Sequence, residues 1–446
     1  MNRRQFLARS GVTLAGVLLA ACAGGSTATP TATPAPTKAP ATSPTTAPAA
    51  AASPTASAST PSPASQPTPT TGVARSTTPF KIGVIVALTG DLAASGKRHV
   101  DGMQLALDEL GGKAGGRQLQ LLAEDSAGSP QQAVAKVRRL VESEHVDAIT
   151  GFTITPELTA NRDYLHQNQQ LTLVSTAGWP DLTRNPAVRS PYIFRTSFCQ
   201  GQYEYILAQW AYDKGGFRSV AFMAPDYSTG HATADVFRTY FKKAGGQVTT
   251  EVYPPLNTQD FGPYFQRLSQ SIGDAKAVWT WFIGADAIRF MTQFQDFGLK
   301  DKYTVLSTAE VGDEPYLKEV GDAALNIISA INYAARYDRA ENKAFVDRFQ
   351  AKYNRLPGHL EYWGYITVMI LAKALDAVSG DTSNKDAFLQ AIRNVRFQGP
   401  MNEVHFHPEA QGLYVTVVVR KVQKLADGTL GNVVVADYPN VHDLSF

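Results

Sequence analysis

The segment Lys81–Leu110, KIGVIVALTGDLAASGKRHVDGMQLALDEL, decides the fold because it places a buried strand directly before an amphipathic helix. Residues 81–87 form an apolar, β-branched run of strand length. Residues 98–110 repeat apolar side chains at the spacing of one helical face. The side chains on that face are Val100, Met103, Leu107 and Leu110. The segment therefore predicts the first strand and the first helix of an α/β sheet.

The same alternation continues along the chain. Residues 118–123 and 146–150 have strand patterns, and residues 131–143 between them have a helical pattern. Beyond residue 198, helices are predicted at 203–212 and 232–243, and strands at 219–224, 277–283 and 304–307. Strands separated by helices imply crossover connections, so the sheets are expected to be parallel and buried on both faces. The predicted fold class is α/β, with two doubly wound lobes joined by a hinge.

Breaks in the pattern predict where the two lobes meet. Polar and turn residues interrupt it near 186–196 and near 331–336, and these segments are expected to cross between the lobes. The aromatic-rich helix predicted at 361–379 is expected to return to the first lobe. The predicted boundaries are 80–197 plus about 335–396 for the N-terminal lobe, and 198–334 plus about 397–446 for the C-terminal lobe.

The first 21 residues have the pattern of an export signal. Arg3 and Arg4 precede a short apolar stretch that ends in small residues. The sequence RRQFL resembles the twin-arginine export signal, although ordinary secretory signals also carry paired arginines. The sequence Leu19-Ala20-Ala21-Cys22 resembles the bacterial lipobox, which implies that Cys22 is lipidated and becomes the new N-terminus. The alternative is a chance cysteine in a signal peptide.

Residues 22–79 follow as a linker of almost only Ala, Thr, Ser, Pro and Gly. Twelve of the 26 prolines of the chain lie here. Such a composition buries too little apolar surface to offset the entropy of ordering, so a disordered, extended tether is predicted. Its threonines and serines could also carry O-glycans, which the composition leaves open.

Charge and cysteine content exclude several classes of protein. The chain has 446 residues, of which 41 are basic and 39 acidic, and the first 79 residues hold five of the basic ones and no acidic one. The remainder is mildly acidic, which argues against nucleic-acid binding. Two cysteines exclude a disulfide scaffold, and no zinc-binding cysteine pattern is present. If Cys22 is acylated, Cys199 is left as a small buried side chain.

Loops after the predicted strands are rich in Ser, Thr, Gly and aromatic residues. In open α/β sheets, ligands bind beyond the carboxyl ends of the strands. The loops concerned are 88–97, 151–159, 175–183, 225–230, 282–286 and 308–313. Loops of this composition supply hydroxyls, backbone N–H groups and aromatic faces, so they predict a site for a small polar ligand.

Several short sequences together resemble a known family. After the opening segment come GGRQLQLLAEDSAGSPQQAVAKVRRLV, VDAITG, STAGWPDLT, DYSTG, DFGLK and EYWGY. The chain over residues 80–446 resembles the branched-chain amino-acid-binding protein family, the type I periplasmic binding proteins that feed ABC importers. The resemblance implies that two lobes close by a hinge around a ligand in the cleft between them.

The resemblance also implies which residues contact the ligand. They are Ser95, Thr155, Thr176, Ala177, Gly178, Trp179, Tyr227, Thr229 and Glu310. Thr155 and the loop Thr176–Gly178 match the groups that hold a ligand carboxylate, with Trp179 beside them as a wall. Tyr227 and Thr229 match the turn that faces the ligand side chain, and Glu310 matches the acid that pairs a ligand ammonium.

Three of these positions depart from the family pattern. Relatives often have an aromatic residue at the position of Ser95, a threonine at that of Gly178 and a tyrosine at that of Thr229. Thr176 is then the alternative source of the missing hydroxyl. Because these departures change the pocket, the ligand stays open among an amino acid, an amide and an aromatic acid. Zwitterion binding requires hydrogen-bond donors at one end and a carboxylate at the other.

Other interpretations of these residues remain open. Thr155 precedes Pro156, so it could serve only as a helix cap, and residues 362–365 (YWGY) are expected to pack, with one ring able to reach the cleft. The glycines of residues 111–116 follow a helix, which is the wrong context for a phosphate loop. His405 and His407 could share a strand face, but no third metal ligand is evident.

The expected function is a lipid-anchored solute-binding protein outside the cytoplasm that passes its ligand to the permease and ATPase of an ABC importer. A sensor head of the same fold, coupled to a membrane signalling partner, is the alternative. No GxSxG, HExxH, P-loop or strand-following GxGxxG sequence is present, so an enzyme is not expected, and neither a cofactor nor a metal is predicted.

Overall fold

Strands and helices alternate through residues 78–446, which is the part of the chain that the computed structural model describes. They form two large sheets and one small two-stranded sheet within one compact unit. The predicted α/β fold class is confirmed. The predicted export signal, Cys22 and the linker up to residue 77 lie outside the described residues.

The first sheet has the strand order β2-β3-β1-β4-β5-β6. Its strands are β1 (Phe80–Val86), β2 (Lys113–Ala114), β3 (Arg117–Asp125), β4 (Ala148–Gly151), β5 (Thr172–Val174) and β6 (Ile193–Arg195). All neighbours are parallel except β2 and β3. The order β3-β1-β4-β5-β6 is that of a doubly wound sheet, whose ligands bind at the carboxyl ends of the strands.

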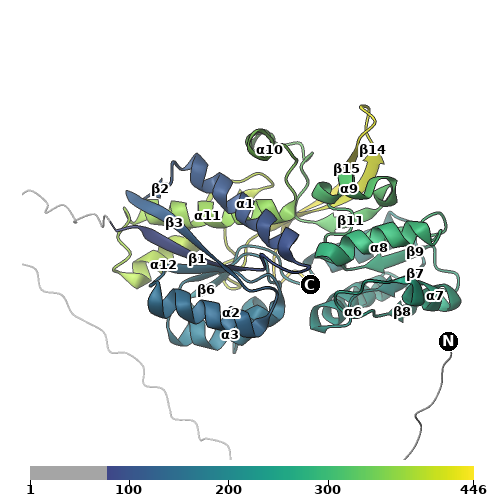
Figure 1. Cartoon of the computed structure of the whole chain (residues 1–446), viewed down its shortest axis with the longest axis horizontal. Coiled ribbons are helices and arrows are strands. Elements are labelled where there is room, and N and C mark those ends of the chain that lie inside the picture. The colour runs from purple at the N-terminus through teal and green to yellow at the C-terminus, as the bar shows by residue number, and fades with distance from the viewer. Residues whose placement is uncertain (1–77) are drawn as a thin grey trace, which may run out of the picture. The chain divides into compact units, whose positions relative to one another are not determined.

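Helices cover both faces of this sheet (Figure 1). One side carries α2 (Pro130–Arg138), which runs on into a π-helical turn at Arg139–Ser143, and α3 (Thr155–Gln167). The other side carries α1 (Ala93–Glu109), α11 (His359–Ala377) and α12 (Lys385–Arg393). The short helix α4 (Asp181–Arg184) follows β5. We call the first sheet with these helices the first lobe.

The second sheet repeats this design and adds two antiparallel strands. Its order is β15-β14-β11-β10-β9-β7-β8, in which β8-β7-β9-β10-β11 reproduces the doubly wound order. The strands are β7 (Ser219–Met223), β8 (Gln247–Val252), β9 (Ala277–Thr280), β10 (Thr304–Ser307), β11 (Ile328–Ile331), β14 (Val415–Lys424) and β15 (Leu430–Val441). Strands β14 and β15 form an antiparallel pair at one edge.

Most of the remaining elements alternate along the chain with the strands of the second sheet. The helices are α5 (Gln202–Asp213), α6 (Ser228–Lys243), α7 (Gly262–Ser271), α8 (Gly284–Asp296), α9 (Leu317–Val320) and α10 (Ala340–Tyr353). Two 3₁₀ turns lie at Glu314–Tyr316 and Gly321–Ala324, and the small sheet pairs β12 (Phe397–Gln398) with β13 (Glu403–Val404). We call the second sheet with its packed helices the second lobe.

Close contact between α1 and α11 places side chains from both helices at the cleft. A Cβ atom at Gly102 would lie 1.9 Å from the carbonyl oxygen of Glu361, and one at Gly364 would lie 2.2 Å from that of His99. Only glycine allows the two backbones to approach so closely. Helix α11 is buried on nearly all sides, as expected for a helix that is apolar around its circumference.

Several element boundaries differ from the sequence prediction, and those of α1 and β9 lie at the cleft. Helix α1 begins at Ala93 rather than at residue 98, because its first turn is made of small residues that carry no apolar periodicity. Within that turn, a Cβ atom at Gly96 would lie 1.8 Å from the carbonyl oxygen of Ala87. Strand β9 ends at Thr280 rather than at residue 283, and Trp281 and Ile283 beyond it line a cavity instead of continuing the sheet.

The chain passes between the two sheets three times: from β6 to α5, from β11 toward α11, and from α12 toward β14. The predicted residue boundaries of the lobes stay predictions. Cys199, on the first passage, is buried and free. None of the helices in residues 78–446 is long and apolar enough to cross a membrane.

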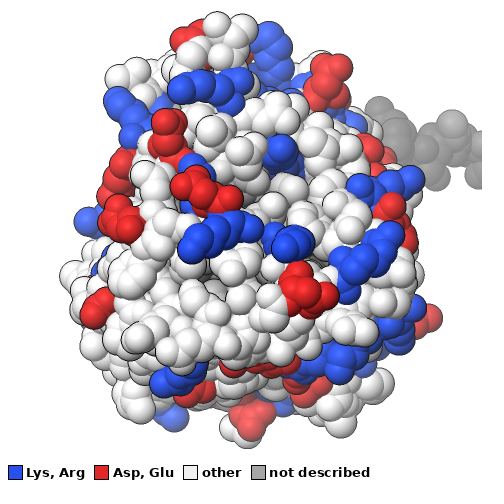
Figure 2. All heavy atoms as spheres, turned by 90° about the vertical axis from the view of Figure 1, so that its right-hand side faces the viewer, with Lys and Arg blue, Asp and Glu red and all other residues white. Residues whose placement is uncertain are grey.

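The second lobe presents a surface of mixed charge at its outer end. Figure 2 shows this face, where Lys and Arg side chains are interspersed with Asp and Glu and large uncharged areas separate them. No broad basic surface appears on this face of the described residues. This distribution agrees with the nearly balanced count of 41 basic and 39 acidic side chains.

Candidate functional site

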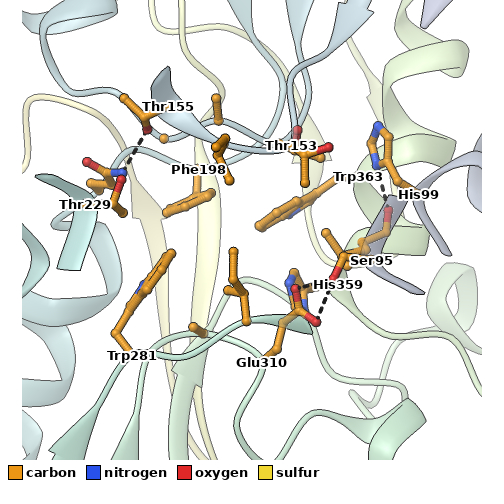
Figure 3. A pocket seen from close by; sticks show the side chains of 18 of the residues that line it. Ser95, His99, Thr153, Thr155, Phe198, Thr229, Trp281, Glu310, His359 and Trp363 are labelled. Carbon is orange, nitrogen blue, oxygen red and sulfur yellow. Dashed lines mark hydrogen bonds between the residues drawn. The ribbon is translucent and has the colours of Figure 1, made fainter. Parts of the chain in front are cut away.

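A cavity lies where the carboxyl ends of both sheets meet, with walls from both lobes (Figure 3). It offers about 60 Å³ to the centres of water molecules, and one buried water needs roughly 10–15 Å³ by that measure. The space therefore suits a small organic molecule rather than a single ion or a peptide. The side chains of Ser95, Trp281, Glu310 and Trp363 in its walls are each 5% exposed or less.

The structure brings eight of the nine predicted site residues into the walls of this cavity. They are Ser95, Thr155, Thr176, Ala177, Gly178, Tyr227, Thr229 and Glu310. Trp179 does not line it, and packs instead against the apolar cluster around Val174 and Leu182. Its carbonyl oxygen accepts a hydrogen bond from Arg195.

Unpaired hydrogen-bond donors gather on the first-lobe wall. Thr155 is the first residue of α3 and makes no side-chain capping bond, so the alternative role as a helix cap is wrong. Its hydroxyl oxygen accepts a hydrogen bond from Gln200 Nε2 at 3.1 Å, which leaves its own proton available. The N–H groups of Ala177 and Gly178 have no acceptor among the described residues. The N-terminal end of α3 further favours an anion here.

The hydroxyl of Thr176 is already used by the protein. It donates to the carbonyl oxygen of Gly151 at 3.0 Å and to that of Phe152. A single hydroxyl proton cannot serve these acceptors and a ligand together. Thr176 thus lines the cavity and fixes its own loop against the end of β4, whereas Thr155 keeps a hydroxyl proton that no protein acceptor uses.

The glycine at position 178 is explained by an aromatic ring behind it. A Cβ atom there would lie 2.7 Å from Cζ of Phe198 and 2.9 Å from Cγ of Gln200. A threonine, as relatives often have at this position, would collide with both side chains. The departure from the family pattern is therefore coupled to Phe198, which occupies the space that a larger side chain would need.

Aromatic rings that the sequence analysis did not assign to the site form much of the first-lobe wall. Phe198 stacks on Tyr203 and on Trp363, with ring centroids 5.3 Å and 5.2 Å apart. The Tyr203 hydroxyl and the Trp363 Nε1 both donate to Asn332 Oδ1, at 2.7 Å and 2.9 Å. Trp363 is the one ring of residues 362–365 that lines the cavity.

The second-lobe wall consists of Tyr227, Thr229, Trp281 and Glu310, among others. Tyr227 occupies the N-cap position of α6 without a side-chain capping bond, and Thr229 lies in the first turn of that helix. Trp281 follows β9 directly, and its ring centroid lies 6.1 Å from that of Tyr227. Burial raises the pKa of the Tyr227 hydroxyl, so this group stays protonated.

Glu310 already has several partners within the protein. Ser95 Oγ donates to its two carboxylate oxygens at 3.0 Å and 3.1 Å, and Gly284 N–H donates at 3.3 Å. The hydroxyl of Tyr316 donates to Oε2, and Arg98 Nη1 lies 3.6 Å from the same oxygen. The carboxylate is therefore largely compensated, with the most free capacity at Oε1.

Arg98 stands at the centre of a buried ion network behind Glu310. Its guanidinium contacts Glu361 at 2.9 Å and Asp313 at 2.7 Å, and Arg420 contacts Asp313 at 2.8 Å. Burial alone would raise the pKa of Asp313, but the charges of His359, Arg420 and Arg98 hold this pKa well below its usual value. Such a network keeps the carboxylates ionised and fixes α1 against both lobes.

Two histidines that were not predicted as site residues also line the cavity. Burial lowers the pKa of His99 to about 4, so its ring is neutral near pH 7. Its Nδ1 contacts the carbonyl oxygen of Leu360 at 3.0 Å and its Nε2 contacts Ser175 Oγ at 2.8 Å. His359 Nδ1 lies 3.0 Å from Asp313 Oδ2. No sequence motif marks either residue.

No group of three or more potential metal-ligating side chains occurs within residues 78–446. His405 and His407 both pack on the ring of Tyr414, with centroids 4.6 Å and 5.4 Å apart. The cavity walls offer hydrogen-bonding groups and aromatic rings to a bound molecule.

Two doubly wound lobes with a ligand-sized cavity between them define the class of two-lobed solute-binding proteins. The family model described as periplasmic binding protein matches residues 79–428. The chain belongs to this family, and membership implies a location outside the cytoplasm.

Individual relatives agree with this class. The Leu/Ile/Val-binding protein homolog 6 of Brucella melitensis is 29% identical over 79% of this chain and 90% of its own length. The ABC transporter substrate-binding protein from Sphaerobacter thermophilus is 44% identical, with a TM-score of 0.77, over 82% of this chain and all of its own. A solute binding protein of an ABC transporter from Rhodopseudomonas palustris, in complex with 3,4-dihydroxybenzoic acid, is 30% identical, with a TM-score of 0.77, over 82% of this chain and 99% of its own.

Proposed function

We propose that this protein is the solute-binding component of an ABC importer and captures a small aromatic carboxylate between its lobes. One observation carries this proposal: a cavity walled by aromatic rings holds, on its first-lobe side, a hydroxyl and two backbone N–H groups that no protein acceptor uses, next to the N-terminal end of α3. A carboxylate loses its hydration on entering such a site and needs donors in return. An aromatic ring needs flat apolar walls.

The donors for the carboxylate are the Thr155 hydroxyl and the N–H groups of Ala177 and Gly178. All three residues lie at the ends of parallel strands in the first lobe, next to the N-terminal end of α3. Charge-assisted hydrogen bonds of this kind are about twice as strong as neutral ones. We assign the acidic end of the ligand to this wall.

The rings for the ligand body are Phe198 and Trp363 from the first lobe side and Tyr227 and Trp281 from the second lobe. Because both lobes contribute, a ligand that fills the space contacts both and favours the closed arrangement. Closure by a hinge is then driven by ligand contacts that the open arrangement lacks. The aromatic acid bound by the Rhodopseudomonas palustris relative supports this choice of ligand class.

An amino acid is the second candidate, and Glu310 is the observation that favours it. A ligand ammonium would need Glu310 Oε1, which accepts only from Ser95. The Leu/Ile/Val-binding name of the Brucella melitensis relative supports it as well. We place it second because Arg98, at 3.6 Å, already compensates the charge of Glu310.

A thermal-shift screen separates the two candidates. Benzoate and 4-hydroxybenzoate are expected to stabilise the protein, by about 2.7 kcal/mol at a concentration of 100 Kd. Benzamide, which has the same ring without the negative charge, is the control for the carboxylate, and cyclohexanecarboxylate is the control for the flat ring. Stabilisation by leucine and by neither benzoate would overturn the aromatic assignment in favour of the amino acid.

The proposal has two further parts. The protein is anchored in the membrane by a lipid on Cys22, and it delivers its ligand to the permease and ATPase of the importer. Cys22→Ser is expected to yield unlipidated protein that leaves the membrane fraction, and continued membrane attachment would contradict anchoring there.

A sensor head of the same fold is the alternative to import. Permease and ATPase genes beside the gene for this chain would favour import, and a gene for a signalling protein there would favour sensing.

A further inference from the structure

Trp281 carries a buried hydrogen-bond donor that nothing in the protein uses. The residue lines the cavity from the second lobe and is 5% exposed. Its indole Nε1 has no hydrogen-bond partner among the described residues. An indole N–H can only donate, and buried polar groups in folded proteins nearly always have a partner. The unpaired N–H of Trp281 therefore calls for an acceptor from a bound molecule.

The other tryptophans near the site differ in this respect. The Nε1 of Trp363 donates to Asn332 Oδ1 at 2.9 Å and is satisfied by the protein. The Nε1 of Trp279 is also unpaired, but Trp279 packs among Phe222 and Phe237 in the core and does not line the cavity. Trp281 alone of these three combines an unpaired N–H with a place in the cavity wall.

Three hydroxyls lie on the same wall as Trp281, those of Tyr227, Thr229 and Thr308. Those of Tyr227 and Thr229 are close to each other, and neither has another partner among the described residues. Hydroxyl oxygens both donate and accept. A ligand hydroxyl at this wall could accept a hydrogen bond from Trp281 and donate its own proton to Thr229 or Tyr227.

The second-lobe wall faces the donors of the first lobe. Figure 3 shows Trp281 entering the cavity from the side opposite Thr155 and Phe198. A ligand whose carboxylate contacts Thr155 and Gly178 would direct its far end toward Trp281. We infer that the ligand carries a hydroxyl or carbonyl oxygen at that far end, and that Trp281 selects oxygenated over unsubstituted aromatic acids. This inference rests on the proposed aromatic carboxylate.

Affinity ratios measured by calorimetry test the role of Trp281. The probes are benzoate, 3-hydroxybenzoate and 4-hydroxybenzoate, titrated into the wild-type protein, Trp281→Phe and Trp363→Phe. Wild type is expected to bind at least one hydroxybenzoate about tenfold more tightly than benzoate, since a site with a buried donor rejects a ligand without its acceptor. Trp281→Phe is expected to reduce this ratio to about one.

The ratio separates hydrogen bonding from packing. Any loss of ring contact in Trp281→Phe weakens all three acids alike and cancels in the ratio. Trp363→Phe is the matched control, because its N–H is occupied by Asn332, and it should leave the ratio as in wild type. A wild-type ratio near one, or a ratio that Trp281→Phe leaves unchanged, would overturn the inference alone. Failure of all three acids to bind would overturn the proposed function together with it.

Discussion

Ser95 Oγ lies 3.0 Å from Glu310 Oε1, although 215 residues separate the two side chains in the sequence. Ser95 belongs to the first turn of α1 in the first lobe, and Glu310 follows β10 in the second lobe. The hydrogen bond therefore spans the cleft. Because it closes only when the lobes approach, it adds to the free energy of the closed arrangement and to ligand affinity.

Ser95→Ala is expected to weaken the binding of every ligand by about tenfold or more, since a hydrogen bond to a charged group contributes about 1.5 kcal/mol or more. The loss should not depend on ligand chemistry, because the bond joins the lobes and does not involve the ligand. Calorimetry with two different ligands measures it. Ser143→Ala, at an exposed serine of the first lobe, is the control and should change nothing. A loss confined to one ligand would instead make Ser95 a direct contact.

Glu310→Gln separates an aromatic acid from an amino acid as the ligand. Glutamine still accepts hydrogen bonds from Ser95 and Tyr316 but carries no negative charge. For an aromatic carboxylate the affinity is expected to change less than about tenfold, because only charge-assisted bonds between the lobes are weakened. A loss of more than about 100-fold would indicate pairing with a ligand ammonium and contradict the first candidate. Calorimetry with 4-hydroxybenzoate and leucine provides both readings.

The strand and helix pattern was sufficient to predict the fold class and the loops that form the site. Thr155, Thr176 and Glu310 could be predicted because each lies in the loop after a strand and matches the family pattern. The roles within the site depend on contacts that no local pattern carries. Whether the hydroxyl of Thr176 faces a ligand or the carbonyl oxygen of Gly151 is decided by the packing of neighbouring loops.

The aromatic residues of the site were not predicted, because the sequence around each of them is apolar, as it is around core residues. Trp281 extends an apolar strand and was assigned to that strand, and Trp363 lies in a helix that is buried on almost every side. Arg98 pairs with Glu361, which is 263 residues away in the chain. An apolar run that continues past the last paired residue of a strand is the signal that could have marked Trp281.

Thr155→Val tests the carboxylate end of the site. Valine keeps the shape of threonine but lacks the hydroxyl that no protein acceptor uses. Affinity for a carboxylate is expected to fall about 10- to 100-fold, which corresponds to one charge-assisted hydrogen bond of about 1.5–3 kcal/mol. Thr176→Val is the contrast, because it removes bonds to the protein and should lower the free energy of unfolding more than the affinity. Equal affinity losses in the two variants would contradict this division of roles.

Gly178→Ala tests the coupling between this glycine and Phe198. The new Cβ atom would lie 2.7 Å from the Phe198 ring, so the ring or the loop must shift. We expect a loss of about 1–3 kcal/mol in the free energy of unfolding, together with weaker ligand binding. Adding Phe198→Leu to Gly178→Ala should restore part of the stability, although Phe198→Leu alone destabilises. Additive effects in the double variant, measured by denaturant unfolding, would show that the two positions are independent.

Buried Glu157 is expected to lower the free energy of unfolding as the pH rises. Burial raises its pKa to about 7 in the folded protein, whereas the unfolded value is 4.5. Between these values the folded protein binds the proton more tightly, so this residue lowers stability as the pH rises from 4.5 to 7. Glu157→Gln removes that effect, so its stability relative to wild type should increase between pH 5 and pH 8 by up to ~3 kcal/mol. Glu319→Gln, at an exposed position, is the control and should show no such trend in the same denaturant titrations. A difference in the free energy of unfolding between Glu157→Gln and wild type that does not change with pH would mean that the Glu157 carboxylate is ionised throughout.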